Sequence, residues 1–301
     1  MKVRIGYGLG TRSLTNDASR FGAFVDALEG CGFDSLWLSE RITGDCPDPL
    51  IGLAVAAGRT RKLKLGTSVQ VLPGRNPVLL AKEWASLDRL SNGRTLPAFG
   101  LGVADPREQQ AFGVARGDRA KWFDEALPLI RRLWTEDAVD HDGARFHFEA
   151  VSVRPKPVQQ PPDVWLGGLA PSELRRIGRL GDGWLPSFCT PADVERARPA
   201  ILEAAAAAGR TFDDEHWGAL VAYTAGAIPD AVATALSARR PDLDDPSEVI
   251  ASGLDGLHAR IEEFVAAGAS KFVVVPLAEP ADWDAELVVV ADALLPLQRA
   301  A

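Results

Sequence analysis

The feature that most constrains this chain is a regular alternation of short apolar strands with amphipathic helices, which runs through the whole sequence. Residues 3–9 are predicted as a strand, and Phe21, Phe24, Val25 and Leu28 then follow at the spacing of one helical face. Further strands are predicted at 35–39, 63–72, 96–101, 164–166, 183–185, 220–224 and 272–275. Eight strands, nearly all followed by a helix, in 301 residues predict an α/β fold, a (β/α)8 TIM barrel formed by residues 1–301 as one domain.

The alternation is interrupted once, after Trp134. Residues 139–153 alternate around Asp142-Gly143, which predicts a β-hairpin, and the proline-rich stretch 154–162 follows as a connector. We therefore expect an insertion over about 136–160. The later helices are predicted at 172–180, 191–208, 229–239, 248–267 and 283–295.

A doubly wound sheet also alternates strands with helices, but it should carry a glycine-rich nucleotide fingerprint after its first strand. Here Gly6 and Gly8 are followed by Thr11 at the position of the third glycine, and no capped helix begins there. The barrel is therefore the better interpretation of the pattern.

Composition excludes several classes of function. The 33 basic and 41 acidic side chains give a net charge of −8, which argues against a nucleic-acid surface. No apolar run approaches the roughly 18 residues of a membrane span, and the N-terminus lacks a signal peptide's apolar stretch. Three cysteines without a Cys-x-x-Cys pair are typical of a reduced, cytoplasmic chain, and the four histidines lack metal-ligand spacing. We expect a small-molecule partner, with no nucleic acid, membrane or metal.

Candidate site residues follow from the barrel itself, because TIM-barrel active sites lie at the C-terminal ends of the strands. The residues at those positions are Thr11, Arg12, Ser39, Glu40, Arg41, Val69, Gln70, Arg75, Asn76, Gly102, Asp105, Glu108, Gly167, Gly168 and Ser187. Glu40 and Arg41 could bind a polar substrate or transfer a proton, but an ion pair that ties down the loop is an equal alternative.

Two glycine turns on this list favour a flat, anionic ligand. Gly167 and Gly168 end a strand and Pro171 begins a helix, so backbone amides aimed by a helix N-terminus favour a phosphate site over a simple tight connection. Gly102 would let a flat ligand approach the backbone. The carboxylate of Asp105 could act as a general acid or base, or could simply be solvated.

Seven short segments, in order and at consistent spacing, resemble the luciferase-like monooxygenase superfamily. They are DPL at 48–50, LGTSVQVLP at 65–73, NPVLLAK at 76–82, LDRLSNGR at 87–94, FGLG at 99–102, VWLGG at 164–168 and LGDGWLP at 180–186. The resemblance covers about residues 1–190 and implies a TIM-type barrel with a strand insertion that binds FMN or the deazaflavin coenzyme F420. The chain is most similar to the F420-dependent oxidoreductase branch, which is common in actinobacteria.

The resemblance also implies roles for individual residues. It implies a non-proline cis peptide at Ser68–Val69 that supports the ring from behind. Asp105 lies near the position of an acidic residue that acts beside the ring in some relatives, and Gly102 lets the ring pass closely. The cofactor phosphate would be received by Gly167, Gly168, Leu169 and Ala170.

One departure from the family pattern changes the expected mechanism. Where several relatives end the second strand with a histidine, this chain has Glu40-Arg41, so a mechanism that uses the histidine cannot be transferred. Arginine does not exchange protons near neutral pH, so Arg41 would hold an anionic substrate or the cofactor while Glu40 or Asp105 manages the proton. The substrate is expected among Thr11, Arg12, Glu40, Arg41, Arg75 and Asp105.

The resemblance implies an F420-dependent oxidoreductase that transfers a hydride between the deazaflavin C5 and a small organic substrate. Relatives commonly form homodimers. One alternative is an FMN-dependent two-component monooxygenase that uses O₂ and a flavin reductase as its partner. A second alternative is a barrel that binds the cofactor without turnover.

Overall fold

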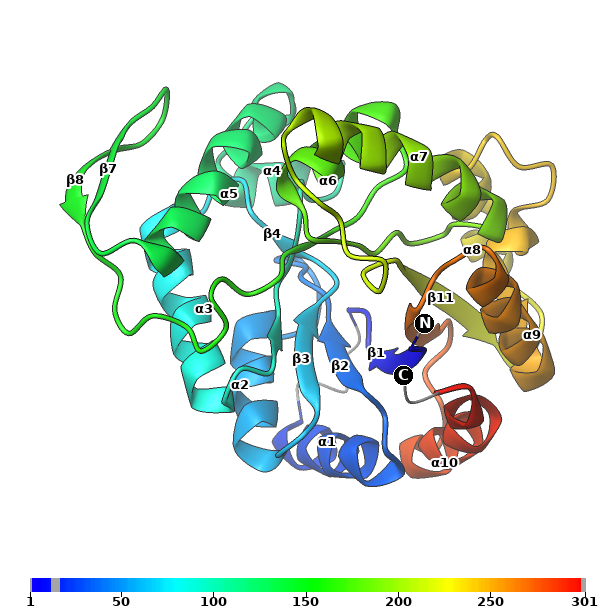
Figure 1. Cartoon of the computed structure of the whole chain (residues 1–301). Coiled ribbons are helices and arrows are strands. Elements are labelled where there is room, and N and C mark those ends of the chain that lie inside the picture. Colours follow the sequence, from blue (N-terminus) through cyan, green and yellow to red (C-terminus); the bar gives the residue numbers. More distant parts are fainter. Residues whose placement is uncertain (1, 12–16, 299–301) are drawn as a thin grey trace.

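The computed structural model describes residues 2–11 and 17–298, and its parallel strands form a ring enclosed by helices (Figure 1). In chain order the strands of the ring are β1 (Arg4–Gly8), β2 (Ser35–Leu38), β3 (Lys64–Thr67) with β4 (Gln70–Val71), β5 (Thr95–Leu96) with β6 (Ala98–Gly100), β9 (Trp165–Leu166), β10 (Gly183–Trp184), β11 (Gly218–Thr224) and β13 (Lys271–Pro276). Ladders join each strand to the next from β11 through β13 and β1 to β10. Parallel bridges Trp184–Trp217 and Ser187–Leu220 close the ring, so the predicted barrel is confirmed.

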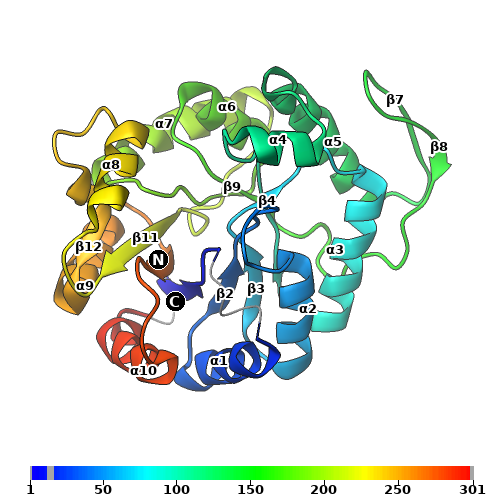
Figure 2. The ribbon, with the colours of Figure 1, turned by 180° about the vertical axis from the view of Figure 1, so that it is seen from behind.

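Helices surround the ring, as the view from behind also shows (Figure 2). They are α1 (Ala18–Cys31), α2 (Pro49–Arg59), α3 (Pro77–Ser91), α4 (Pro106–Phe112), α5 (Arg119–Thr135), α6 (Pro171–Leu180), α7 (Pro191–Ala207), α8 (Asp230–Arg239), α9 (Gly253–Ala266) and α10 (Trp283–Leu294), with 3₁₀ turns at Arg116–Asp118, Pro246–Val249 and Leu295–Leu297. Several begin with proline in the first turn, after a cap whose side chain accepts backbone N–H groups: Asp48, Asn76, Asp105 and Thr190. Each cap, together with the proline that follows it, determines the residue at which a loop ends and a helix begins.

The structure corrects three of the expected elements. The strand predicted over 63–72 is divided into β3 and β4 at the Ser68–Val69 peptide, and the strand predicted over 96–101 is divided into β5 and β6 at Pro97. The helix predicted over 248–267 is shorter, because β12 (Ile250–Ser252) pairs with β11 outside the ring before α9 begins.

The inserted hairpin projects away from the barrel (Figure 1). It consists of β7 (Val139–Asp142) and β8 (His147–Val151), which pair antiparallel as predicted. A carboxylate oxygen of Glu125 on α5 accepts the backbone N–H groups of Arg145 and Phe146, both at 3.1 Å. The insertion is therefore anchored to α5, on the side of the barrel.

Two indoles fill the inside of the ring. Trp37 and Trp165 are fully buried and meet edge to face, with ring centroids 6.4 Å apart. Glycine is required beside each of them, because a Cβ at Gly66 or Gly183 would lie 2.4 Å from an indole carbon. The Lys271 ammonium lies 5.9 Å from both ring centroids, at the N-terminal end of β13. These side chains form a solid floor beneath the C-terminal ends of the strands.

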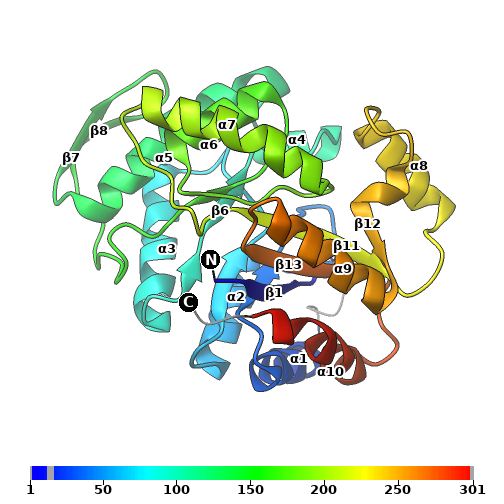
Figure 3. The same ribbon diagram turned by 45° about the vertical axis from the view of Figure 1, so that its right-hand side comes forward.

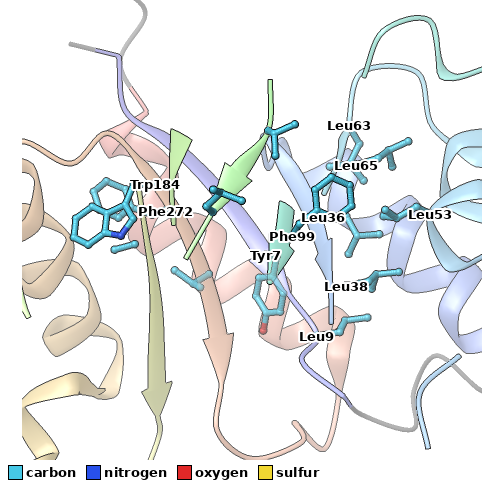
Figure 4. Packing of buried hydrophobic residues seen from close by; sticks show 14 of the residues in the cluster. Tyr7, Leu9, Leu36, Leu38, Leu53, Leu63, Leu65, Phe99, Trp184 and Phe272 are labelled. Carbon is cyan, nitrogen blue, oxygen red and sulfur yellow. The ribbon is translucent and has the colours of Figure 1, made fainter. Parts of the chain in front are cut away.

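A second apolar layer lies between the strands and the helices. Figure 4 shows Leu53 of α2 facing Leu36 and Leu38 of β2, and all three are buried. On another side α9 packs over β11 (Figure 3). Within residues 2–11 and 17–298, every helix is too short or too polar to span a bilayer.

Candidate active site

A cavity of about 590 Å³ opens where the strands of the ring end. Of the residues predicted from the sequence, it is lined by Thr11, Ser39, Glu40, Arg41, Ser68, Val69, Gly102, Glu108, Gly167, Gly168 and Ser187. Leu169 and Ala170 line a neighbouring cavity, and Arg12 lies outside the described residues. Arg75 and Asp105 reach this site only through the side chains of Glu40 and Arg41. The structure therefore brings most of the predicted residues together at one end of the barrel.

The peptide between Ser68 and Val69 is cis, as predicted. Its position is fixed by the end of β2: the Ser39 hydroxyl donates to the Ser68 carbonyl at 2.9 Å, and the Ser68 N–H donates to the Leu38 carbonyl at 2.8 Å. On the other side, the Glu40 N–H donates to the Val69 carbonyl at 3.2 Å. Val69 is consequently held in the wall of the cavity.

Glycines leave room for a flat ligand beside this wall. A Cβ at Gly100 would lie 2.6 Å from Val69 Cγ2, so only glycine fits there without displacing Val69. Gly102 has φ +80°, a backbone conformation that favours glycine. The neighbouring Leu101 and Val103 carbonyls accept from Arg119 at 3.1 and 2.9 Å, which fixes the turn from behind.

Glu40 is a buried carboxylate whose hydrogen bonds face the backbone behind the cavity. Its side chain is 2% exposed; it accepts the Val71 N–H at 2.7 Å and forms an ion pair with Arg75. Burial raises the pKa of Glu40, although Arg75 and the Val71 N–H oppose the rise. Arg75 also donates to the Val71 carbonyl at 3.0 Å. The structure thus places Arg75 as the counter-ion of Glu40, not among the residues that line the cavity.

Arg41 projects into the cavity and is held by two acids of α4. Its guanidinium donates to Asp105 at 3.2 Å and lies 3.5 Å from Glu108, while its side chain remains 34% exposed. Burial alone would raise the pKa of Glu108, but hydrogen bonds from Thr43 and Ile42 outweigh it and lower that pKa. Hydrogen bonds from Arg107 lower the pKa of Asp105, which also caps α4. Asp105 and Glu108 are therefore ionised acceptors at neutral pH, suited to orienting Arg41.

A second cavity, of about 430 Å³, shares Gly168, Glu173, Ser187 and Arg239 with the first. The two spaces therefore meet at these residues, beside the Gly167–Gly168 turn. The second cavity extends the site beyond this boundary and is lined mainly by charged side chains.

The cations of the second cavity are not equivalent. Arg240 is buried and forms ion pairs with Asp193 at 2.9 Å and Asp242 at 2.8 Å, and Arg196 also pairs with Asp193. Arg239 donates to the Ser187 hydroxyl at 3.2 Å and has no ion pair within the described part of the chain. Burial lowers the pKa of Arg239 and the Glu173 carboxylate opposes that shift, so Arg239 is a cation balanced only at a distance where the two cavities meet.

The Gly167–Gly168 turn differs from its sequence-based interpretation in one respect. The N–H groups of Leu169 and Ala170 both donate to Glu173, each at 3.0 Å. Sequence reasoning missed both Glu173 and Arg239. Glu173 stands three residues after the helix cap Ala170, the spacing of a capping box, and that signal could have found it. Arg239 lies at the end of a correctly predicted helix, without any local signal.

Metal chemistry has no candidate residues in this region. Across the described ranges 2–11 and 17–298, no group of three or more His, Cys, Asp or Glu side chains is placed to hold an ion.

Comparisons with known proteins agree with this geometry. A family model described as luciferase-like monooxygenase matches residues 2–253. An F420-dependent glucose-6-phosphate dehydrogenase of Kineococcus radiotolerans is 28% identical over 221 residues, which are 69% of this chain and 64% of that protein. The match thus spans less than two thirds of this relative's own length.

Two solved structures share the fold. An F420-dependent secondary alcohol dehydrogenase in complex with an F420–acetone adduct superposes with a TM-score of 0.82 at 21% identity, covering all of both chains. The oxygenating constituent of 3,6-diketocamphane monooxygenase of Pseudomonas putida, in complex with FMN, gives 0.76 at 18% identity and covers 98% of this chain and 99% of that chain.

Proposed function

Because the chain belongs to the luciferase-like monooxygenase family, we propose that it is an oxidoreductase that uses coenzyme F420 and a small organic substrate. The observation that carries this proposal is the joined pair of cavities. One is backed by the cis Ser68–Val69 peptide and glycines, and the cation Arg239, which forms no ion pair within residues 2–11 and 17–298, lies where the two meet. A flat ring attached to an anionic tail has this shape and charge distribution.

The residues present fit the ring end of such a cofactor. Gly100 and Gly102 have no side chain to obstruct a planar ligand, and Val69, Leu185 and Val275 supply apolar contacts. Arg239 and Arg196 would hold the anionic tail. The name of the dehydrogenase relative also supports the cofactor. When bound, F420 supplies hydride transfer at the deazaflavin C5, and the protein supplies position, electrostatics and exclusion of water.

The side chains around the ring position divide into substrate-binding and proton-handling groups. Arg41, oriented by Asp105 and Glu108, presents its remaining N–H donors to the cavity and would bind a carbonyl or an anionic group. Glu40 and Glu108 both line the cavity, but the pKa of Glu40 is raised, whereas the pKa values of Asp105 and Glu108 are lowered. Glu40 is therefore our candidate for exchanging the proton that accompanies hydride transfer.

The test is a fluorescence titration of the purified protein with F420 and, in parallel, with FMN. We expect saturable binding of F420 at lower concentration than FMN. Preference for FMN, together with O₂ consumption in the presence of a flavin reductase, would establish a two-component monooxygenase instead. Binding of F420 without turnover of any hydride donor or acceptor would favour a non-catalytic barrel.

A further inference from the structure

The turn expected to receive a cofactor phosphate already contains an anion of the protein. One carboxylate oxygen, Glu173 Oε2, accepts the N–H groups of both Leu169 and Ala170 at 3.0 Å. Gly168, with φ +116°, allows this close approach, because a Cβ there would lie 2.5 Å from the same oxygen. The two backbone donors that an incoming phosphate would use are therefore satisfied before it arrives.

The charge of Glu173 is balanced only through space, because the carboxylate acts on Arg239 without forming an ion pair with it. No cation lies within ion-pair distance of its carboxylate in residues 2–11 and 17–298, and the side chain lines both cavities. Arg239 lines the same two cavities, lies 4.8 Å from the Phe188 ring centroid and forms no ion pair in those residues. A phosphate that binds here consequently meets one cation and one fixed anion, which already act on each other.

We propose that Glu173 is a specificity-determining residue that favours a cofactor whose phosphate carries a single negative charge. The inference rests on the proposed function, since it requires a phosphate-bearing cofactor in these cavities. The phosphate of F420 is a diester with one charge, whereas FMN ends in a monoester that carries about 1.5 to 2 charges at neutral pH. Coulomb repulsion by a fixed carboxylate grows with that charge, so Glu173 penalises FMN more than F420.

The experiment compares dissociation constants for F420 and FMN in the wild type and in Glu173→Gln. Glutamine keeps a side-chain oxygen that accepts from the Leu169 and Ala170 amides but carries no charge. The affinity for FMN relative to F420 should rise about tenfold in this variant, and Glu173→Ala should change the ratio in the same direction. Glu195→Gln, an exposed residue of α7 that lines neither cavity, is the control and should leave the ratio unchanged.

A second readout needs no cofactor. Inorganic phosphate should raise the unfolding temperature of the Glu173→Gln protein more than that of the wild type, because the turn at Gly167–Gly168 then lacks the competing negative charge of Glu173. The outcomes separate the two proposals. If both cofactors bind but neither variant changes their ratio, or if Glu173→Gln weakens both equally, the specificity role is wrong and the proposed function survives. If the wild type binds neither cofactor, the proposed function is wrong and this inference with it.

Discussion

Removal of the cation that neutralises Glu40 should destabilise the barrel, and the loss should depend on pH. Glu40 is 2% exposed and Arg75 is 22% exposed, so the pair is largely withdrawn from water. Arg75→Met keeps the aliphatic stem and deletes the guanidinium. Breaking a buried pair by removing one partner costs about 3–5 kcal/mol. Because the Val71 N–H still donates to Glu40 and Arg75 is partly solvated, we expect about 3 kcal/mol.

The sign of the pH dependence follows from Glu40. Burial raises its pKa even beside Arg75, and loss of Arg75 raises it further. A carboxyl whose pKa is higher in the folded than in the unfolded state contributes stability that is fully present below the unfolded pKa and is lost as pH rises through the folded pKa. The deficit of Arg75→Met should therefore be larger at about pH 8 than at about pH 5.

Urea unfolding, extrapolated linearly to water, measures this deficit at both pH values. Arg20→Met is a matched control, because its exposed ion pair with Glu279 is worth about 0–1 kcal/mol. In the double variant Glu40→Gln/Arg75→Met the buried charge is gone, so most of the lost stability should return. A deficit that is equal at both pH values, or a double variant no more stable than Arg75→Met, would refute the reasoning.

Three further predictions concern single residues. Arg41→Lys should raise the KM for substrate at least about tenfold, because the planar fork held by Asp105 is lost; unchanged steady-state kinetics would remove the role. Arg239→Leu should weaken F420 binding by about tenfold with little change in unfolding temperature, since Arg239 forms no ion pair within the described residues and acts on Glu173 only through space; equal binding in a titration would contradict this. Burial lowers the pKa of Lys271 to about 8 despite the nearby Asp34 carboxylate. The contribution of Lys271 to stability should therefore increase as pH rises from about 8 to 10.5. An NMR titration of its ε-methylene that gives an ordinary lysine pKa would contradict this prediction.

The barrel could be predicted because its signals are local. Apolar periodicity located the strands, and Pro77 and Asn76 show how a cap and a first-turn proline fix a helix start. The cis peptide at Ser68–Val69 came from the family resemblance, whereas the division of the strand at that peptide was not predicted, since periodicity indicated one strand over 63–72. β12 was missed because Ile250–Ser252 is a short apolar run beside a helical stripe, and only its pairing with β11 distinguishes it.

The sequence predicted which residues lie near the cavity, but not which of their side chains form ion pairs with one another. The rule that strand ends carry function placed Glu40, Arg41 and Gly168 correctly around one cavity. It could not show that Arg75 neutralises Glu40, because that contact joins residues 35 positions apart through the tertiary structure. The role of Arg239 could not be predicted for the same reason, since it depends on which carboxylates the tertiary structure places near the guanidinium.

The floor of paired indoles has a kinetic consequence. Trp37 and Trp165 fill the barrel below the cavity, so the cavity is closed at its lower end and opens among the loops at the strand ends. If the proposed cofactor binds with its ring against Val69, deep in this cavity, whatever binds nearer the mouth covers it. On the proposed function, the substrate would then enter last and leave first, and a tightly bound substrate would hold the cofactor beneath it. The order of binding would follow from the packing, because glycines such as Gly66 and Gly183 make room for the two tryptophans that close the lower end.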